Sequence, residues 1–452
     1  MKPIQDYEIV QRNRDGFAEL PFAGRWKEAF AENQTVVLRI RREDDNTVVC
    51  WWTPCRTEGR DWSVTVKVPA GGLYRAEAVL VDNYNPELRM GFEWNRLVGE
   101  VEHFGVGEVF AVFGQSNMAG YGRGTAFDPP ELGVHMLANN GKWKIASHPI
   151  NAQSDAVYLN SDGNSGTSPV LSFGRMMRRR LNLPVGFQLE PCGGVPLSLF
   201  HPEMDGRLYR EFLTKTAENG PVAGILWYQG CTDANDKTNG WAEHYYENFC
   251  RMTELWRRDL GEVPIVTAQL NKWAANPGGD VTMDRGWGMV REALRQAARK
   301  LEDVYCIPTL DLPMSDGIHN GSAGNVVIGE RMAAALLCGH YGQPGSLAPS
   351  VNRVKRLSDT EVLITFDGGG AGFDIRTVDE VYARGVEFED EEGLIPCVRL
   401  HRSGEGVAVT AARPIGKNAK FHAYWRCDSV GFMIYDINGM PMLSCCGVPV
   451  EE

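Results

Sequence analysis

Between residues 34 and 81 the chain alternates apolar and polar positions with a period of two. The apolar members include Val36, Leu38 and Ile40 and, further on, Trp62, Val64, Val66 and Val68. This period is typical of half-buried antiparallel strands. The sequence Pro69-Ala70-Gly71-Gly72 supplies a turn between two such runs. The pattern predicts a β-rich, jelly-roll-like domain over residues 1–105.

After Gly107 short apolar runs alternate with helical patterns. Five runs are strand candidates: Glu108–Phe113, Pro184–Leu189, Val222–Tyr228, Pro264–Leu270 and Val304–Leu310. Helical faces lie between them, one with Tyr245, Phe249, Met252 and Trp256, another with Trp287, Val290, Leu294, Ala297 and Leu301. Such alternation is the signature of β-α units around a parallel sheet. We predict a three-layer α/β/α domain with five parallel strands over residues 106–342, with Ser322 as N-cap of its last helix.

Beyond Gly342 the composition changes again. Turn-forming Pro344, Gly345 and Pro349 lead into alternating runs at Glu361–Phe366 and Phe421–Trp425, which are rich in β-formers. We therefore predict a second β-rich region over residues 343–452.

Composition narrows the classes of partner. The 452 residues carry a net charge of -12 with scattered Lys and Arg, whereas nucleic-acid binding needs a concentrated basic stripe. No run of about 18 apolar residues and no secretory signal is visible, which predicts no membrane partner and a cytoplasmic protein unless a signal has been removed. The 11 cysteines are an odd number without Cys-x-x-Cys spacing, which favours reduced thiols over disulfides or zinc. The oligomeric state does not follow from the sequence.

The strand candidate Glu108–Phe113 stops at Gly114 and presents Ser116. A strand, a tight turn and a helix start can expose a hydroxyl above the end of a sheet, beside free backbone N–H groups. Ser116 is therefore a candidate nucleophile, although a lone serine at this place is also an ordinary helix N-cap.

A serine nucleophile needs a base and an orienting carboxylate. Both occur after the fifth strand candidate, where Asp316 and His319 are three residues apart. The carboxylate can bond one imidazole nitrogen while the other nitrogen faces Ser116. Loops after parallel strands meet at the C-terminal edge of the sheet, so this loop and Ser116 are expected side by side.

Two more loops are expected at that edge and suit an oxyanion hole. Gly193 and Gly194 follow the second strand candidate, and Gln229 follows the third. Glycine N–H groups approach a substrate closely, and a Gln amide donates further hydrogen bonds. Each of these residues alone has a structural explanation, but their occurrence at matching strand ends favours a hydrolytic site.

Together, Gly114-Gln115-Ser116-Asn117-Met118, Gly193-Gly194, Trp227-Tyr228-Gln229-Gly230 and Asp316-x-x-His319 resemble the SGNH (GDSL-like) hydrolases, and most closely their sialate O-acetylesterase-like carbohydrate esterases. The resemblance implies a flavodoxin-like core. It also implies Ser116 as nucleophile, His319 as general base and acid, Asp316 as its orienter, and an oxyanion hole of Ser116, Gly193 or Gly194, and Gln229. The family needs no metal or cofactor. The chain differs from the family pattern at two positions. Cys231 stands where relatives often have Glu, and Asn320 stands where Pro often follows the histidine.

This resemblance implies a carbohydrate O-acetylesterase, sialate 9-O-acetylesterase-like, that acts on an O-acetylated sugar through an acetyl-serine intermediate. Candidate substrate contacts are Gln115, Asn117, Arg123 and Trp227, with Tyr228 and Trp273 as aromatic residues that line either a sugar cleft or the core. Arg123 would suit the carboxylate of a sialate.

Three alternatives remain beside this function. An acetylxylan or other plant-polysaccharide acetylesterase would use the same chemistry. A catalytically inactive carbohydrate-binding protein would use its β regions instead. A lipase or thioesterase would need an apolar lid, and no apolar surface segment suggests one. The α/β-hydrolase class is less consistent, since its Gly-x-Ser-x-Gly turn needs glycine where this chain has Met118.

Overall fold

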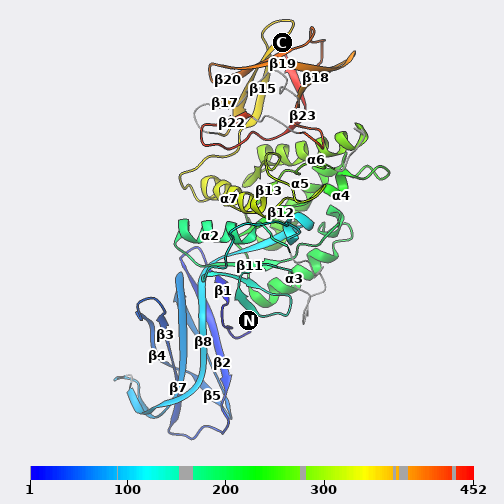
Figure 1. Cartoon of the computed structure of the whole chain (residues 1–452). Coiled ribbons are helices and arrows are strands. Elements are labelled where there is room, and N and C mark those ends of the chain that lie inside the picture. Colours follow the sequence, from blue (N-terminus) through cyan, green and yellow to red (C-terminus); the bar gives the residue numbers. More distant parts are fainter. Residues whose placement is uncertain are drawn as a thin grey trace.

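The computed structural model describes residues 2–88, 90–151, 166–274, 281–369, 373–375, 385–429 and 434–452. Three parts follow one another along the molecule: an N-terminal β region, a central α/β part and a C-terminal β barrel (Figure 1). All 11 cysteines are free. Within the ranges just given, no helix has the length and apolar character needed to cross a membrane.

The strands of the N-terminal region pair antiparallel, except that β1 pairs with β8 in parallel. They are β1 (Ile9–Gln11), β2 (Phe17–Arg25), β3 (Gln34–Arg42), β4 (Val48–Pro54), β5 (Arg56–Glu58), β6 (Asp61–Pro69), β7 (Gly71–Asn85) and the first part of β8 (Met90–Gly114). One sheet has the order β2-β6-β5, and β3 pairs with β4 and β7 in another. The alternation that predicts these strands buries Val36, Leu38 and Ile40 in a core shared with Leu20 and Trp62.

Strand β8 belongs to two parts of the molecule at once. It pairs antiparallel with β7 in the N-terminal region and then parallel with β11 (Val185–Leu189) and β12 (Gly224–Tyr228) in the central sheet. The boundary expected after residue 105 therefore falls inside one continuous strand that ends two residues before Ser116 (Figure 1).

The central sheet has the order β10-β9-β11-β8-β12-β13-β14. Its remaining elements are α1 (Ser116–Ala119), β9 (Val134–Leu137), β10 (Trp143–Ile145), α2 (Val170–Leu181), η1 (Leu197–Leu199), α3 (Arg207–Asn219), α4 (Cys231–Ala234), α5 (Tyr245–Leu260), β13 (Ile265–Ala268), α6 (Val281–Lys300), β14 (Val304–Ile307) and α7 (Ser322–Gly339). All five predicted runs contain parallel strands, but the predicted count of five is incomplete. β9 adds another parallel strand, and β10 is antiparallel.

Helices cover both faces of this sheet. Along β8, Val109 and Phe113 point into a core with residues of α3, α5 and α6, whereas Phe110 and Val112 point into a core with residues of α2 and α7. A strand buried on both faces reads as a continuous apolar run, which is the pattern of residues 109–113. The last helix begins one residue from the prediction: Gly321 is its N-cap, and Ser322 is its first residue.

The C-terminal region is a closed barrel with the order β15-β16-β20-β19-β18-β21-β23, beside the pair β17-β22. The strands are β15 (Ser350–Arg356), β16 (Glu361–Asp367), β17 (Phe373–Ile375), β18 (Val386–Asp390), β19 (Gly393–Ser403), β20 (Gly406–Ala411), β21 (Lys420–Ala423), β22 (Ile434–Asp436) and β23 (Cys445–Glu451). β16 covers the first predicted run, and β21 covers Phe421–Ala423 of the second, whose last two residues lie outside the strand.

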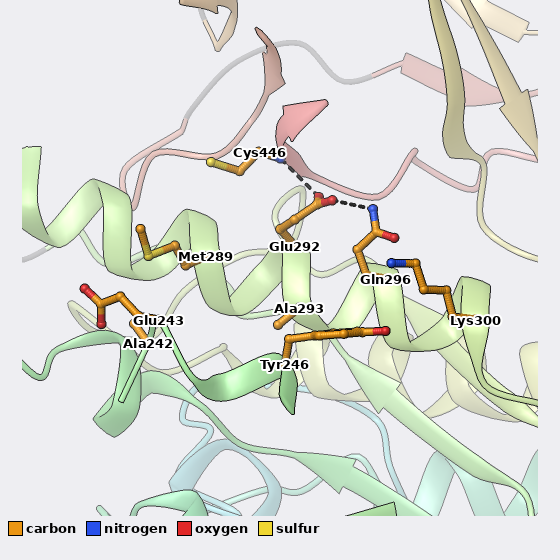
Figure 2. Close-up of a pocket in the computed structure, with 9 residues that line it drawn as sticks. All are labelled: Ala242, Glu243, Tyr246, Met289, Glu292, Ala293, Gln296, Lys300 and Cys446. Carbon is orange, nitrogen blue, oxygen red and sulfur yellow. Dashed lines mark hydrogen bonds between the residues drawn. The ribbon is translucent and has the colours of Figure 1, made fainter. Parts of the chain in front are cut away.

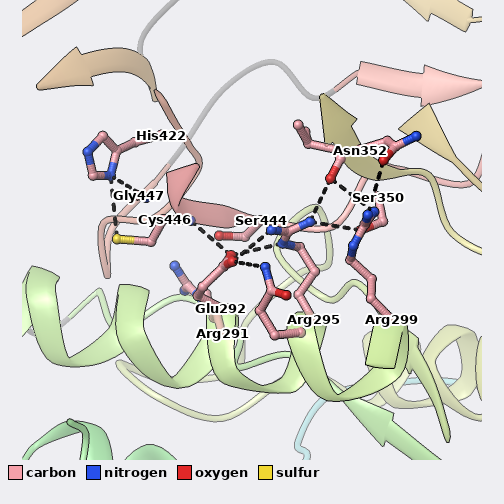
Figure 3. Close-up of polar contacts among 12 residues, drawn as sticks. Arg291, Glu292, Arg295, Arg299, Ser350, Asn352, His422, Ser444, Cys446 and Gly447 are labelled. Atoms are coloured by element: carbon pink, nitrogen blue, oxygen red, sulfur yellow. Dashed lines mark hydrogen bonds and ion pairs between the residues drawn. The ribbon is translucent and has the colours of Figure 1, made fainter. Parts of the chain in front are cut away.

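The barrel sits on α6. Arg295 of this helix donates to Ser350 Oγ at 3.0 Å and to the carbonyl of Val351 at 2.8 Å, and Glu292 accepts from the N–H of Cys446 at 3.1 Å (Figure 3). A groove of about 340 Å³ opens where α5, α6 and β23 meet, with Tyr246 and Lys300 among its lining residues (Figure 2). This groove contains none of the predicted site residues.

Candidate active site

The turn after β8 requires glycine at position 114. Gly114 has φ +141°, and a Cβ there would lie 2.3 Å from the carbonyl oxygen of Tyr228. The close approach of the β8 and β12 ends is stabilised by Gln115, whose N–H donates to that same carbonyl at 3.0 Å. Ser116 then opens α1, so its N–H is one of the helix-start donors without an intrahelical acceptor.

Ser116, His319 and Asp316 form one hydrogen-bonded series. His319 Nε2 lies 2.9 Å from Ser116 Oγ, and His319 Nδ1 lies 2.8 Å from Asp316 Oδ2. Ser116 is 7% exposed, whereas the side chains of His319 and Asp316 are 17% and 47% exposed. The hydroxyl is thus recessed, and the imidazole lies between it and a carboxylate at the surface.

The carboxylate of Asp316 is held in its charged form. Partial burial alone would raise its pKa, but donors outweigh this effect, and the pKa lies below the ordinary value. The donors are the N–H groups of Ile318 and His319, at 2.9 and 2.8 Å from Oδ1, and the His319 ring. An ionised carboxylate here orients the imidazole and stabilises its protonated form.

Asn117 connects the serine turn to the histidine loop. Its Oδ1 accepts from the N–H of Asn320 at 2.9 Å, and its Nδ2 donates to the carbonyl of Ile318 at 3.2 Å, so it bonds the residues on both sides of His319. Asn117 is 1% exposed. The expected substrate contact is therefore corrected: this side chain is buried and engaged in holding the loop.

Tyr121 and Asn320, neither of which was expected to act in the site, complete this support. The Tyr121 ring stacks on the His319 imidazole with centroids 5.0 Å apart. Asn320 is fully buried and donates to Asn117 Oδ1 at 3.2 Å and to the Tyr228 hydroxyl at 2.9 Å. The only signal for Asn320 was its place after the histidine, where relatives often have Pro, and Tyr121 had no signal beyond its proximity to Ser116.

The glycine loop lies against the serine turn. Glu190 N–H donates to the carbonyl of Val112, and Cys192 N–H donates to that of Gly114 at 3.0 Å. Gly194 has φ +69°, and a Cβ there would meet open space. Below the loop, Glu190 forms a buried ion pair with Lys215. The loop that carries Gly193 and Gly194 is therefore anchored directly beside Ser116.

Gln229 has a different position from the one expected. Its Nε2 donates to the carbonyl of Val195 at 3.0 Å and to Asp233 Oδ2 at 2.5 Å, and its Oε1 accepts from the Tyr245 hydroxyl at 2.9 Å. Both amide hydrogens are thus engaged, one with the glycine loop and one with Asp233 of α4. Burial raises the pKa of Asp233 to about 6 against the hydrogen bonds from Gln229 and Leu197 N–H. The expected role of Gln229 as an oxyanion donor is therefore corrected: this side chain is fully buried and supports the glycine loop.

Three further expectations concern substrate contacts. Trp227 is fully buried and donates to the Tyr245 hydroxyl at 3.2 Å, and Tyr228 is 1% exposed, so neither lines a sugar cleft. Gln115 is also buried, and its Oε1 accepts from the N–H groups of Gly230 and Cys231 at 2.9 and 3.0 Å. Trp227 and Tyr228 thus lie in the core, one of the two places that the sequence left open for them, and Gln115 holds the turn after β12.

Arg123 and Trp273 remain accessible. Arg123 is exposed on the loop after α1, its carbonyl accepts from the N–H of Ser322 at 2.9 Å, and within the described ranges its guanidinium has no ion-pair partner. Trp273 is partly buried and stacks on Trp287 with centroids 6.0 Å apart. The Cys231 thiol is buried, which raises its pKa to about 12 and removes it from substrate contact.

A serine, an imidazole and a carboxylate at the C-terminal edge of a mostly parallel α/β sheet define a hydrolase of the SGNH type. The family model for "Carbohydrate esterase, sialic acid-specific acetylesterase" matches residues 106–338, which is more than half of the chain. The protein belongs to this family and is a carbohydrate esterase that hydrolyses O-acetyl esters. No group of three or more His, Cys, Asp or Glu side chains among the residues with described positions is arranged to hold a metal ion.

One solved structure shares the fold over nearly the whole chain. The chain is similar over 97% of its length to 97% of a carbohydrate acetylesterase from Xanthomonas citri, with 20% sequence identity and a TM-score of 0.67. A protein from Arabidopsis thaliana shares 26% identity over 51% of this chain and 98% of its own, with a TM-score of 0.42. The match to the Xanthomonas enzyme shows that the whole arrangement, including both β regions, occurs elsewhere.

Proposed function

We propose that the protein removes O-acetyl groups from sialic acids through an acetyl-Ser116 intermediate. The observation that carries the proposal is the 2.9 Å contact between Ser116 Oγ and His319 Nε2, with Asp316 behind the imidazole. In this proposal residues 106–342 form a flavodoxin-like, three-layer catalytic domain, and residues 1–105 and 343–452 flank it.

In the acylation step, Ser116 Oγ attacks the acetyl carbonyl carbon while His319 Nε2 takes the hydroxyl proton. Asp316 stabilises the imidazolium that forms. The tetrahedral intermediate then releases the sugar hydroxyl, which receives the proton from His319. In the second step His319 activates a water molecule, which attacks the acetyl-serine, and acetate leaves as Ser116 regains its proton.

Negative charge on the tetrahedral oxygen needs donors at the serine turn. We assign the N–H of Ser116 and a glycine N–H at position 193 or 194. Their support is the anchoring of the glycine loop beside Gly114 and the place of Ser116 at a helix start. Loss of one such donor costs about 2.7 to 4 kcal/mol of barrier in serine hydrolases.

The reaction is tested with p-nitrophenyl acetate. Ser116→Ala is expected to lower kcat about 10⁶-fold, because the remaining groups cannot form the acyl intermediate. Unchanged release of nitrophenol by this variant would contradict the proposal. Sugar binding that persists in the unaltered protein without any turnover would favour the inactive carbohydrate-binding alternative.

The sialate assignment rests on the family description and on Arg123, an exposed cation on the loop that contacts the start of α7. Acetate release should be faster from O-acetylated sialic acid than from acetylated xylan or mannan oligosaccharides. Arg123→Gln should raise KM for the sialate and leave p-nitrophenyl acetate unaffected, because only the sialate carries a carboxylate. Arg14→Gln, an exposed arginine of the N-terminal region, is the matched control. Preference for the neutral oligosaccharides would select the plant-polysaccharide alternative.

A further inference from the structure

The loop that holds His319 is bonded to a segment that the C-terminal barrel also holds. This segment, residues 270–274, follows β13 at the C-terminal edge of the central sheet. Asn271 Nδ2 donates to the carbonyl of Ile318 at 2.8 Å, and the N–H of Ala274 donates to the carbonyl of Gly317 at 2.8 Å. The backbone between Asp316 and His319 thus rests on residues 270–274.

The same segment is fixed from the opposite side by Arg291 of α6. Its Nε donates to the carbonyl of Leu270 at 2.8 Å and its Nη2 to that of Asn271 at 2.5 Å. Its Nη1 donates to three carbonyls of the segment that follows barrel strand β21, those of Tyr424, Trp425 and Arg426, at 3.1, 3.2 and 2.8 Å. Arg291 is fully buried, so each of these bonds is shielded from water.

A direct backbone bond reinforces this connection. The N–H of Trp273 donates to the carbonyl of Cys427 at 2.7 Å, and Cys427 is itself held by Asp284 of α6, whose Oδ1 accepts its N–H at 3.0 Å. Residues 424–427, which follow β21 directly, therefore contact residues 270–274 both directly and through Arg291.

We propose that the C-terminal barrel is a positioning part of the active site, with Arg291 as the positioning residue that sets the histidine loop through residues 270–274. The inference rests on the proposed roles of Ser116, Asp316 and His319. A small displacement of His319 would lengthen its contact with Ser116, and a misplacement of about 1 Å costs about 100-fold in rate.

Arg295 provides a matched control on the same helix. It is 1% exposed and bonds the barrel at Ser350 and Val351, but its remaining bonds go to Glu292 (Figure 3). None of its hydrogen bonds reaches residues 270–274. Arg291→Lys and Arg295→Lys both keep the charge and remove donors that seat the barrel, and only the first disturbs the path to His319.

The experiment compares these two variants in the full chain. Both should lower Tm. Arg291→Lys should lower kcat for p-nitrophenyl acetate by about 10- to 100-fold with little change in KM, and should shift the acid limb of the pH profile of kcat/KM. Arg295→Lys should keep kcat within about twofold and leave the profile unshifted. Equal kcat for the two variants at a similar loss of Tm would overturn the inference.

Amide hydrogen exchange over residues 314–320 gives a readout that needs no turnover. It should quicken in Arg291→Lys and stay unchanged in Arg295→Lys, and equal exchange in both would overturn the inference. If the unaltered protein releases no acetate, the proposed function fails while this comparison still decides the positioning role. Should Arg291→Lys not fold, Asn271→Ser removes the contact to Ile318 and is expected to reproduce the faster exchange.

Discussion

The two β regions attach to opposite edges of the same sheet. The N-terminal region meets the central part where the parallel strands begin: Arg12 pairs with Glu108, and the carbonyl of Tyr7 lies 2.7 Å from His135 Nδ1. The barrel meets it where the strands end, beside residues 270–274 and the histidine loop. Since catalytic side chains gather at the C-terminal edge, regions of similar composition acquire different roles from their place of attachment.

Among the variants that compare the two edges, the largest effect is expected from Asp316→Asn, which lies at the edge with the proposed catalytic residues. Without the carboxylate the imidazole adopts the wrong tautomer, and kcat should fall about 10⁴-fold, or about 5.5 kcal/mol, while Tm hardly changes. Steady-state kinetics and thermal unfolding measure the two effects. The control is Asp303→Asn, because Asp303 pairs with His340 at 3.1 Å at the opposite edge of the sheet. Similar losses of kcat in both variants would contradict the assignment.

At the opposite edge, Arg12→Met should lower the free energy of unfolding and leave kcat nearly unchanged. This is the reverse of the result expected for Asp316→Asn. Glu108 is 2% exposed, and loss of its cation leaves a buried carboxylate, which costs about 3 to 5 kcal/mol of unfolding free energy. Urea unfolding measures the loss, and kcat should stay within about twofold. Arg25→Met is the control, since the Arg25–Asp61 pair is exposed. If Arg12→Met lowered kcat as much as Asp316→Asn does, the proposed difference between the two edges of the sheet would be contradicted.

A pH-dependent contrast involves Glu8 of the N-terminal region. Burial raises the pKa of Glu8 to about 7 against the opposing effects of the Gln5 N–H and Lys2. In the unfolded chain the Glu8 carboxyl loses its proton near pH 4.5, whereas in the folded protein it keeps the proton until about pH 7. The free energy of unfolding should therefore fall by about 3 kcal/mol as pH rises from 4.5 to about 7. Glu8→Gln should flatten this part of the urea-derived stability profile. An unchanged slope would show that Glu8 is not its cause.

The smallest effect is expected for Arg353→Gln. Arg353 pairs with Glu451 on the exposed side of the barrel, where both side chains are about half exposed. Such pairs contribute about 0.2 to 1 kcal/mol. Tm and kcat should both remain near their original values. A marked loss of kcat would mean that parts of the barrel that do not contact α6 also affect the active site.

Much of the site could be predicted from the sequence because its groups follow strands. Ser116 and the Asp316–His319 loop each come directly after an apolar run, and parallel strands bring such loops to one edge. The sequence left open whether Trp227 lies in the core or in a sugar cleft, since a strand buried on both faces gives no alternation that separates the two positions. β9 escaped prediction because its four residues include His135 and so give no continuous apolar run.

The supports of the site could not be predicted in this way. Asn117 and Asn320 are separated by 203 residues, and Arg291 bonds carbonyls more than 130 positions away. The hydrogen bonds of Arg291 go to backbone carbonyls, and Asn117 bonds backbone groups of Ile318 and Asn320; such groups leave no trace in side-chain patterns. The continuity of β8 could not be predicted either. Its sequence changes partway from the pattern of a half-buried strand to that of a fully buried one, and such a change resembles a boundary between domains.

The length of β8 has a mechanical consequence. A pulling force applied to the N-terminal region would be transmitted along β8 into the middle of the central sheet. There β8 is hydrogen-bonded in parallel to β11 on one side and to β12 on the other. Extraction would have to shear both ladders at once. A molecule tethered by its N-terminal region would therefore be expected to bear load without moving Ser116 relative to the loops around it.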